Sequence, residues 1–141
     1  GEIEMANRCL GYPYTIIGKE VNGYHEGRKL GFPTANLDIS HFGQLIPAPG
    51  VYAVNARMEN TVVWKHGMMN IGTRPTFNGK GITLETHIFN FDGDIYDQLL
   101  LVSFVKRIRG EQKFDGPEEL ALQLKEDEET VLSLFDKEAE R

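Results

Sequence analysis

The stretch Ile82-Thr-Leu-Glu-Thr-His-Ile-Phe89 is the part of the sequence that most clearly decides the fold. It is rich in β-branched and aromatic residues, and its polar and apolar side chains alternate, which is typical of a β-strand. Because successive side chains of a strand point to opposite sides, the stretch has two different faces. One face carries Glu85, His87 and Phe89, and the other carries Leu84, Thr86 and Ile88.

Similar short β-forming runs lie on both sides of this stretch. They are separated by clusters of glycine, proline, asparagine and aspartate, which favour turns. With the opening stretch extended to Phe91, the other candidates are Tyr14–Val21, a short run from Pro33 to Leu37, Gly50–Ala56, Thr61–Asn70 and Leu99–Ile108. No helix is expected between these five or six strands, so the pattern predicts a mainly β fold, an antiparallel barrel or sandwich.

The chain is expected to end in one helix. Asp115 is a suitable N-cap, Pro117 suits a first turn, and Glu118 follows the aspartate by three residues. Apolar residues then recur at helical spacing, at Leu120, Leu124, Val131 and Phe135. The acidic residues between them should mostly face solvent, with an acidic binding surface as the alternative; they include Glu118, Glu119, Glu126, Glu128 and Glu129.

Composition narrows the class of protein. The 141 residues suit one domain, and the net charge of −6 argues against general nucleic-acid binding. That charge is uneven: residues 1–110 hold 11 Lys and Arg against 10 Asp and Glu, whereas residues 111–141 hold 4 against 11. No apolar run is long enough to span a membrane, and the single Cys9 cannot form an internal disulfide. These features predict a cytoplasmic protein with neither a nucleic-acid partner nor a membrane partner.

The segment from Gly23 to Asn36 is dense in glycines and cations. Three glycines and two cations in nine residues would let backbone N–H groups approach a phosphate closely. It lacks the spacing of a Walker loop, and a glycine-rich hairpin tip is the structural alternative. Within it, Thr34 and Asn36 stand two apart and would share one face, where their oxygens suit Mg²⁺ beside ATP. A polar turn is the alternative there.

Two further places could carry chemistry. Glu85 lies inside a strongly β-forming run, so it is a candidate to accept a proton from a substrate hydroxyl; a solvated edge-strand carboxylate is the alternative. The segment from Arg107 to Phe114 brings cations, an amide and an aromatic ring together before the helix. A planar ligand could lie against Phe114, or this ring could pack the start of the helix onto the body.

Taken together, these motifs resemble riboflavin kinase. The run G-R-K-L-G-F-P-T-A-N-L from Gly27 to Leu37 and the run L-E-T-H-I-F from Leu84 to Phe89 are the most specific. The other matching runs are Pro49 to Val54, Asn70 to Phe77 and Ile108 to Phe114, and all five occur in the order of that family. The resemblance covers roughly Leu10 to Asp127, nearly the whole chain.

The resemblance implies a six-stranded antiparallel Greek-key β-barrel with a C-terminal α-helix. It also implies an ATP- and Mg²⁺-dependent enzyme that phosphorylates the 5′-hydroxyl of riboflavin to give FMN and ADP. By this resemblance Glu85 is the catalytic carboxylate, and Thr34 and Asn36 hold the metal. The positions implied for ATP are Gly23, Arg28, Gly31, Thr34, Asn36 and His87, and those implied for the flavin are Arg109, Gln112 and Phe114.

The resemblance also bears on domain organisation. Residues 1–13 look like the junction that, in bacterial bifunctional enzymes, follows an N-terminal adenylyltransferase module, so residues 14–141 would be the kinase domain. Tyr96-Asp97 stands where the family usually has Tyr-Gly, which leaves the local turn geometry open. A non-catalytic FMN-binding barrel and an oligonucleotide-binding barrel are the alternatives. The first would leave Thr34, Asn36 and Glu85 without a role, and the second should show cations interleaved with aromatic residues.

Overall fold

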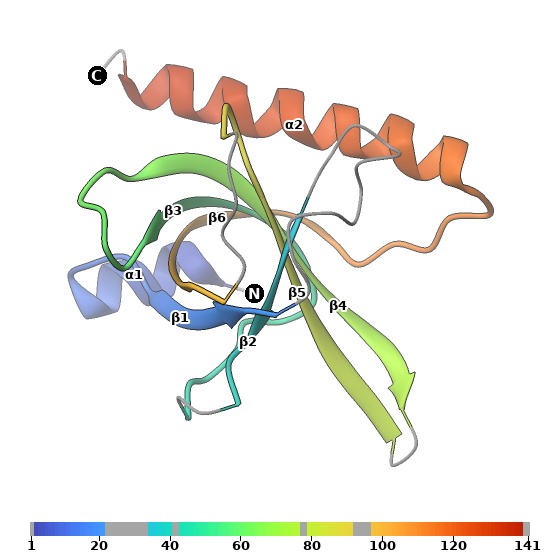
Figure 1. Ribbon diagram of the computed structural model, residues 1–141. Coiled ribbons are helices and arrows are strands. Elements are labelled where there is room, and N and C mark those ends of the chain that lie inside the picture. The colour runs from blue at the N-terminus through green and yellow to red at the C-terminus, as the bar shows by residue number, and fades with distance from the viewer. Residues whose placement is uncertain (1, 22–33, 41–42, 77–78, 92–96, 140–141) are drawn as a thin grey trace.

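The computed structural model describes residues 2–21, 34–40, 43–76, 79–91 and 97–139. The described chain forms six strands and two helices (Figure 1). In chain order these are α1 (Ile3–Leu10), β1 (Thr15–Glu20), β2 (Ala35–Asp38), β3 (Gly50–Met58), β4 (Lys65–Thr76), β5 (Gly79–Ile88), β6 (Leu99–Gly110) and α2 (Pro117–Ala139). No helix within these residues is both long enough and apolar enough to cross a membrane.

The strands close into an antiparallel barrel in the order β1-β2-β5-β4-β3-β6. Strands β3, β4 and β5 are consecutive neighbours, and β6 returns to pair with β3, which is a Greek-key arrangement. This confirms the expected six-stranded barrel with a C-terminal helix. Because the strands alternate in direction, β1, β3 and β5 end where β2, β4 and β6 begin, so three connections meet at one end of the barrel.

Inward-facing apolar side chains fill the barrel. Every second residue of each strand points inward, and these residues form one buried cluster from all six strands. Phe104 is its centre: its ring is fully buried and meets the ring of Tyr52 edge-on at 5.2 Å. Burying a side chain of this size stabilises the fold by about 1.5–3 kcal/mol.

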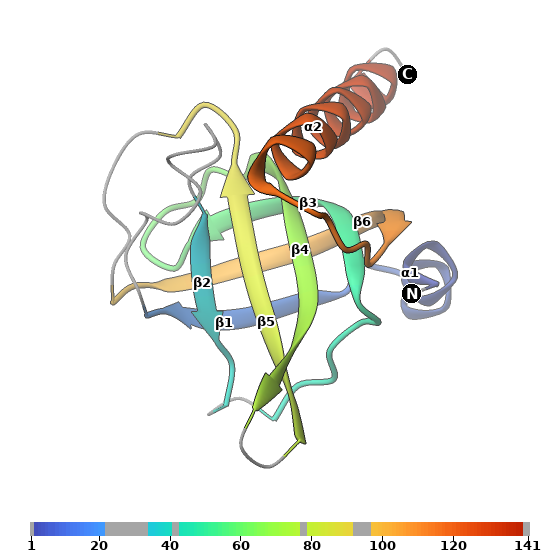
Figure 2. The ribbon, with the colours of Figure 1, turned by 90° about the vertical axis from the view of Figure 1, so that its right-hand side faces the viewer.

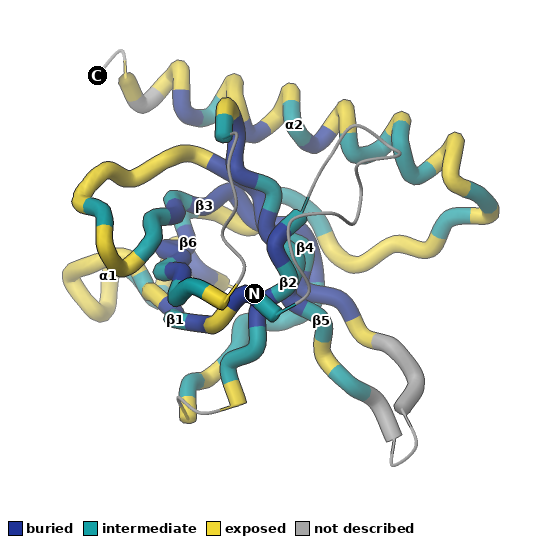
Figure 3. Tube along the Cα trace, viewed as in Figure 1, coloured by how far each residue is buried: buried dark blue, intermediate teal, exposed yellow. Residues whose placement is uncertain are grey.

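A second apolar cluster lies on the outside of the barrel, beneath α2 (Figure 3). Val51 and Ala53 of β3 alternate with inward-facing residues, so this strand is buried on both of its faces. Val131 and Phe135 of α2 cover them, as the helical spacing predicts, and the ring of Phe135 stacks on His66 at 3.7 Å. The five acids expected to face solvent do so with one exception, Glu128, which is half-buried.

Helix α1 is not expected from the sequence, since the family resemblance instead implies a linker over residues 1–13. In the structure Ile3 is 5% exposed and belongs to the main core cluster. The side chain of Asn7 donates to the carbonyl of Phe104 at 2.9 Å and accepts from the N–H of Tyr14 at 2.7 Å. The helix is therefore packed onto the barrel, and the division into linker and domain at residue 13 remains a prediction.

Asp97 settles the turn geometry that the sequence leaves open. Its φ of 65° is left-handed, a conformation that glycine adopts most easily and aspartate tolerates. The N–H of Asp97 donates to the carbonyl of Glu20 at 3.0 Å, and its carboxylate pairs with Lys19 at 2.8 Å. These contacts hold the aspartate in the conformation that a glycine would otherwise supply.

Candidate functional site

Three polar side chains form a row across neighbouring strands on the outer face of the barrel. Asn36 of β2 lies directly opposite Glu85 of β5, and Glu85 lies opposite Asn70 of β4. The strands β2, β5 and β4 lie side by side (Figure 2). Each is flanked along its strand by inward-pointing residues, so all three point outward. Cross-strand neighbours on one face lie within contact range, with Cβ atoms about 4.5–5.5 Å apart. The row therefore gathers two amides around one carboxylate.

Thr34 and His87 continue this site toward the barrel end. Thr34 immediately precedes β2, and the antiparallel register extended by one residue brings it beside His87. Gly67 of β4 is paired with Ile88 of the same strand as His87, and a Cβ at Gly67 would lie 2.5 Å from the carbonyl oxygen of His87. The fold thus brings together four of the predicted residues: Thr34, Asn36, Glu85 and His87.

The imidazole of His87 faces helix α2. Its Nε2 atom lies 3.6 Å from a carboxylate oxygen of Glu128, and its side chain is only 12% exposed. Phe89, two residues further on the same face, meets the imidazole edge-on at 5.5 Å. This confirms that Glu85, His87 and Phe89 share one face, and it shows that α2 covers the far end of that face.

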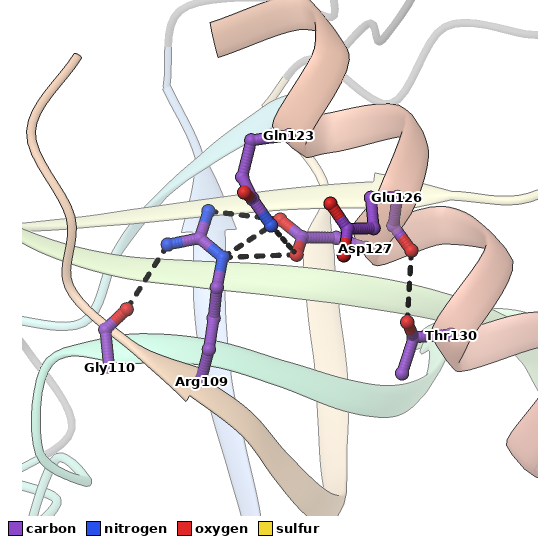
Figure 4. A network of polar contacts seen from close by, with 6 residues as sticks. All are labelled: Arg109, Gly110, Gln123, Glu126, Asp127 and Thr130. Carbon is purple, nitrogen blue, oxygen red and sulfur yellow. Dashed lines mark hydrogen bonds and ion pairs between the residues drawn. The ribbon is translucent and has the colours of Figure 1, made fainter. Parts of the chain in front are cut away.

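Arg109 is held by a buried carboxylate of α2 (Figure 4). Its Nε atom lies 3.0 and 3.1 Å from the two oxygens of Asp127, and Nη2 donates to one of them at 2.9 Å. Asp127 is 2% exposed and also accepts from the amide of Gln123 at 3.0 Å. The guanidinium plane is therefore fixed from two sides, by β6 and by α2.

The segment between β6 and α2 carries the other predicted flavin residues. Phe114 is half-buried, and its ring centre lies 5.8 Å from the guanidinium carbon of Arg109. Glu111 anchors the segment, because its carboxylate accepts from the N–H and the hydroxyl of Thr73 at 3.0 and 3.1 Å. Gln112 is exposed beside it. Arg109 and Phe114 are thus adjacent, with Gln112 on the same segment.

The row connects these two groups of residues. From Asn70 it continues to Val51 of β3 and then to Arg109 of β6, each residue directly opposite the next. Asp127 and Glu128 are adjacent in α2, and they contact Arg109 and His87 respectively. Helix α2 therefore braces both the strand that carries Glu85 and the strand that carries Arg109.

Glu20 is a neighbour of the site that sequence reasoning missed. Its side chain is fully buried at the end of β1, and its carboxylate accepts from the N–H of Asn36 at 3.2 Å. The missed signal is periodicity: Glu20 shares the inward face with Ile16 and Gly18. Asp127 carries a similar signal, since it falls within the apolar stripe between Leu124 and Val131.

The remaining predicted positions, Gly23, Arg28 and Gly31, lie outside the described residues, as does most of the segment from Asn90 to Asp97. At the barrel end where β3 and β5 finish, the structure shows a small, mainly apolar pocket of about 150 Å³. Its lining includes Met58, Ile88, Phe91 and Leu100. A flat apolar group could enter it.

The donor set at Thr34 and Asn36 fits a hard cation. Magnesium prefers oxygen ligands, keeps several waters and shares substrate phosphates, so few protein ligands are needed. A hydroxyl and an amide beside the carboxylate of Glu85 provide such oxygens. Within the described ranges no group of three or more His, Cys, Asp or Glu side chains could hold a metal, so a protein-only cage is not found there.

Comparison with known proteins indicates the family of this chain. The family model described as "Flavokinase: Riboflavin kinase" matches residues 10–135. The bifunctional riboflavin kinase/FMN adenylyltransferase of Haemophilus influenzae is 40% identical over 134 residues, which are 95% of this chain and 42% of that protein. The protein of the same description from Bacillus subtilis is 38% identical over 138 residues, 96% of this chain and 43% of that protein. The chain thus spans less than half the length of these relatives.

Two solved structures are also similar. A crystal structure from Streptococcus pneumoniae, described as a macrolide-efflux protein, has a TM-score of 0.83 at 37% identity and covers 93% of this chain and 42% of that one. The riboflavin kinase of Trypanosoma brucei has a TM-score of 0.60 at 19% identity, covering 89% and 81%, and shows likeness of fold alone. Because the family match includes the strands that carry Asn36, Glu85 and Arg109, this chain belongs to the riboflavin kinase family.

Proposed function

We propose that this domain transfers the terminal phosphoryl group of ATP to the 5′-hydroxyl of riboflavin, giving FMN and ADP. The observation that carries the proposal is the row Asn36, Glu85 and Asn70, with Thr34 beside it. It places one carboxylate next to neutral oxygen ligands on the outer face of the barrel. Family membership and the names of the bifunctional relatives support the same reaction.

Glu85 is the proposed general base. It would accept the proton of the 5′-hydroxyl while that oxygen bonds to the γ-phosphorus and the bond to the β,γ-bridging oxygen breaks. Such a base contributes about 10²–10⁴-fold to the rate. Asn36 and Asn70 flank the carboxylate and orient it, because each side-chain amide can donate to an oxygen. Positioning and charge neutralisation carry most of the catalysis in phosphoryl transfer.

Thr34 and Asn36 are the proposed ligands of Mg²⁺. When bound, the ion neutralises charge on the phosphates of ATP. His87 lies beside these ligands, in the proposed nucleotide region, and the predicted positions Gly23, Arg28 and Gly31 would cover the phosphates. The apolar pocket at the same end of the barrel would suit the adenine ring, since it is small and lined mostly by carbon.

Arg109, Gln112 and Phe114 are the proposed flavin contacts. The guanidinium and the phenyl ring present flat surfaces on the segment between β6 and α2, where a planar ring system could stack. Arg109 and Glu85 lie toward opposite ends of the row, so the flavin ring would lie at one end and the 5′-hydroxyl at the other. The ribityl chain would span the distance from Arg109 to Glu85 beside this row, not across Val51, which is buried beneath α2, so that its 5′-hydroxyl reaches Glu85.

We also propose that the domain works as part of a longer bifunctional enzyme in the cytoplasm. The curated relatives are more than twice as long and are named for FMN adenylylation as well as riboflavin phosphorylation. A linked adenylyltransferase domain would use the FMN made here to form FAD. The cytoplasmic location rests on the single cysteine, Cys9, which is free and exposed.

The decisive experiment is incubation of the purified domain with riboflavin, ATP and Mg²⁺, followed by chromatography of the flavins. The expected result is FMN that forms only when both ATP and the metal are present. A non-catalytic flavin-binding barrel would instead retain FMN or riboflavin and produce no ATP-dependent product. Absence of ATP-dependent FMN under conditions in which riboflavin binds would reject the kinase in favour of that alternative.

A further inference from the structure

Arg109 belongs to the proposed flavin subsite. The positive charge of its guanidinium is compensated by contacts within the fold. Two N–H groups of its guanidinium point at Asp127, and a third, from Nη1, donates to the carbonyl of Gly110 at 3.1 Å. A guanidinium carries five N–H groups, so these contacts engage three of them. These contacts leave one N–H group on Nη1 and one on Nη2 for other partners.

Burial makes this compensation strong. Asp127 is 2% exposed and the side chain of Arg109 is 18% exposed, so water screens their attraction only weakly. The bidentate geometry also fixes orientation as well as distance. Gln123 donates to the carboxylate oxygen from the other side and prevents Asp127 from rotating away. The result is a flat group of nearly zero net charge, anchored to both β6 and α2.

The surroundings of this pair suit an uncharged planar ligand. The guanidinium carbon of Arg109 lies over the ring of Phe114, 5.8 Å from its centre, so a flat polar group and an aromatic ring adjoin each other. A phosphate would need the full charge of Arg109, which Asp127 already neutralises. A neutral ring with carbonyl groups at its edge would accept hydrogen bonds from the two remaining N–H groups of Arg109. It would also stack on the flat surfaces of Arg109 and Phe114.

We infer that Asp127 is a positioning residue that determines the specificity of the flavin subsite. It fixes the plane of Arg109 beside Phe114 and cancels its charge, so the subsite takes a neutral planar ring and rejects free phosphates. This inference rests on the proposed function, in which Arg109 contacts the flavin. It adds a residue on α2 that does not itself touch the substrate.

The test compares Asp127→Asn with Glu126→Gln, a matched loss of one carboxylate at the neighbouring, exposed position of the same helix. Riboflavin affinity is measured by quenching of flavin fluorescence, and Mg-ATP affinity by calorimetry. Asp127→Asn should raise the riboflavin Kd at least about tenfold, the effect expected when one charge-assisted contact is lost. It should leave the Mg-ATP Kd within about twofold. Glu126→Gln should change neither.

Competition between inorganic pyrophosphate and riboflavin, measured at constant ionic strength, distinguishes a role of Asp127 in specificity from a purely structural role. Pyrophosphate should displace riboflavin from Asp127→Asn, where Arg109 keeps its charge, and should not displace it from the wild-type protein. Equal weakening of riboflavin and Mg-ATP binding, without new competition, would mean that Asp127 only stabilises the fold, and the inference would be wrong.

Two further variants keep the test decisive if Asp127→Asn does not fold. Gln123→Met leaves the ion pair in place but removes the donor that holds Asp127, and should raise the riboflavin Kd by about two- to fivefold. In an Arg109→Lys background the effect of Gln123→Met should disappear, because lysine has no plane to orient. Additive effects would overturn the inference. Wild-type protein that binds no riboflavin would instead reject the proposed function.

Discussion

Asn36 and Glu85 face each other where β2 pairs with β5. Strand β2 is four residues long, and two of its residues are paired with β5, one of which is Asn36. The proposed metal ligand and the proposed base are therefore fixed relative to each other by backbone pairing.

Replacing Glu85 by glutamine should separate catalysis from binding. Glutamine keeps the size of the side chain and its place between Asn36 and Asn70, but it cannot accept a proton. Turnover should fall by at least about 10²-fold while riboflavin and Mg-ATP affinities stay close to wild type. Initial rates of FMN formation and fluorescence titrations measure the two effects. Glu129→Gln, an exposed change on α2, is the control, and near-normal turnover of Glu85→Gln would exclude Glu85 as the base.

Removing the hydroxyl of Thr34 should weaken the metal site. Thr34→Val keeps the shape of the residue and the β-branched preference for extended backbone. The Mg²⁺ concentration for half-maximal activity should rise about tenfold, because one oxygen contact to a charged group is lost. Thr130→Val, which removes a hydroxyl that donates to the carbonyl of Glu126 within α2, should leave the metal dependence unchanged. If both variants behave alike, Thr34 is not a ligand.

Glu20 should stabilise the strand that carries the metal ligands. Glu20→Ala removes the acceptor of the Asn36 N–H and should lower the free energy of unfolding by about 1–3 kcal/mol. Glu20→Gln should lower the free energy of unfolding by a smaller amount, because the glutamine side-chain carbonyl can still accept the hydrogen bond from Asn36. Urea denaturation measures both values, and the Mg-ATP affinity should follow the same order. Equal stability of the two variants would show that the bond to Asn36 contributes nothing.

Stability at alkaline pH should depend on Tyr52. Burial raises the pKa of its hydroxyl above the ordinary value of 10.0, although the nearby Arg107 opposes this shift. The folded state therefore holds the proton more tightly than the unfolded state, so this stabilisation is complete below about pH 10 and is lost as pH rises further. Tyr52→Phe should lower the free energy of unfolding by about 0.5–1.5 kcal/mol at neutral pH, because the hydrogen bond to Ala48 is lost. This difference in stability from the wild-type protein should become smaller above about pH 10. A difference in the free energy of unfolding that stays constant from about pH 8 to 11 would show that titration of Tyr52 does not affect stability.

Buried packing around Phe104 should dominate the stability of the barrel. Phe104→Ala should lower the free energy of unfolding by about 3–5 kcal/mol, because a fully buried ring leaves a cavity between Tyr52 and Tyr14. Thermal unfolding followed by circular dichroism measures the loss. Leu122→Ala, at a position of α2 that is 71% exposed, is the control and should change little.

The sequence by itself determined the strands, helix α2 and their faces, but not helix α1. Alternation from Ile82 to Phe89 is a local property, so it correctly places Glu85 and His87 on one face of the strand and Leu84 on the other. The helical spacing of Val131 and Phe135 likewise predicts the face of α2 that is buried. The motifs around Thr34, Asn36 and Glu85 are enough to indicate the family, because a motif depends only on the order of residues along the chain.

Only the tertiary structure decided which of these faces meet. The pairing of Glu85 with Asn70, the bond from Asn36 to Glu20 and the ion pair of Arg109 with Asp127 join residues 15, 16 and 18 positions apart. Periodicity reports the direction of a side chain within its own strand or helix, but it carries no information on the register between elements. Register is set by closure of the whole barrel and by the packing of α2 against it, because these bury the apolar surface that no single element can bury alone.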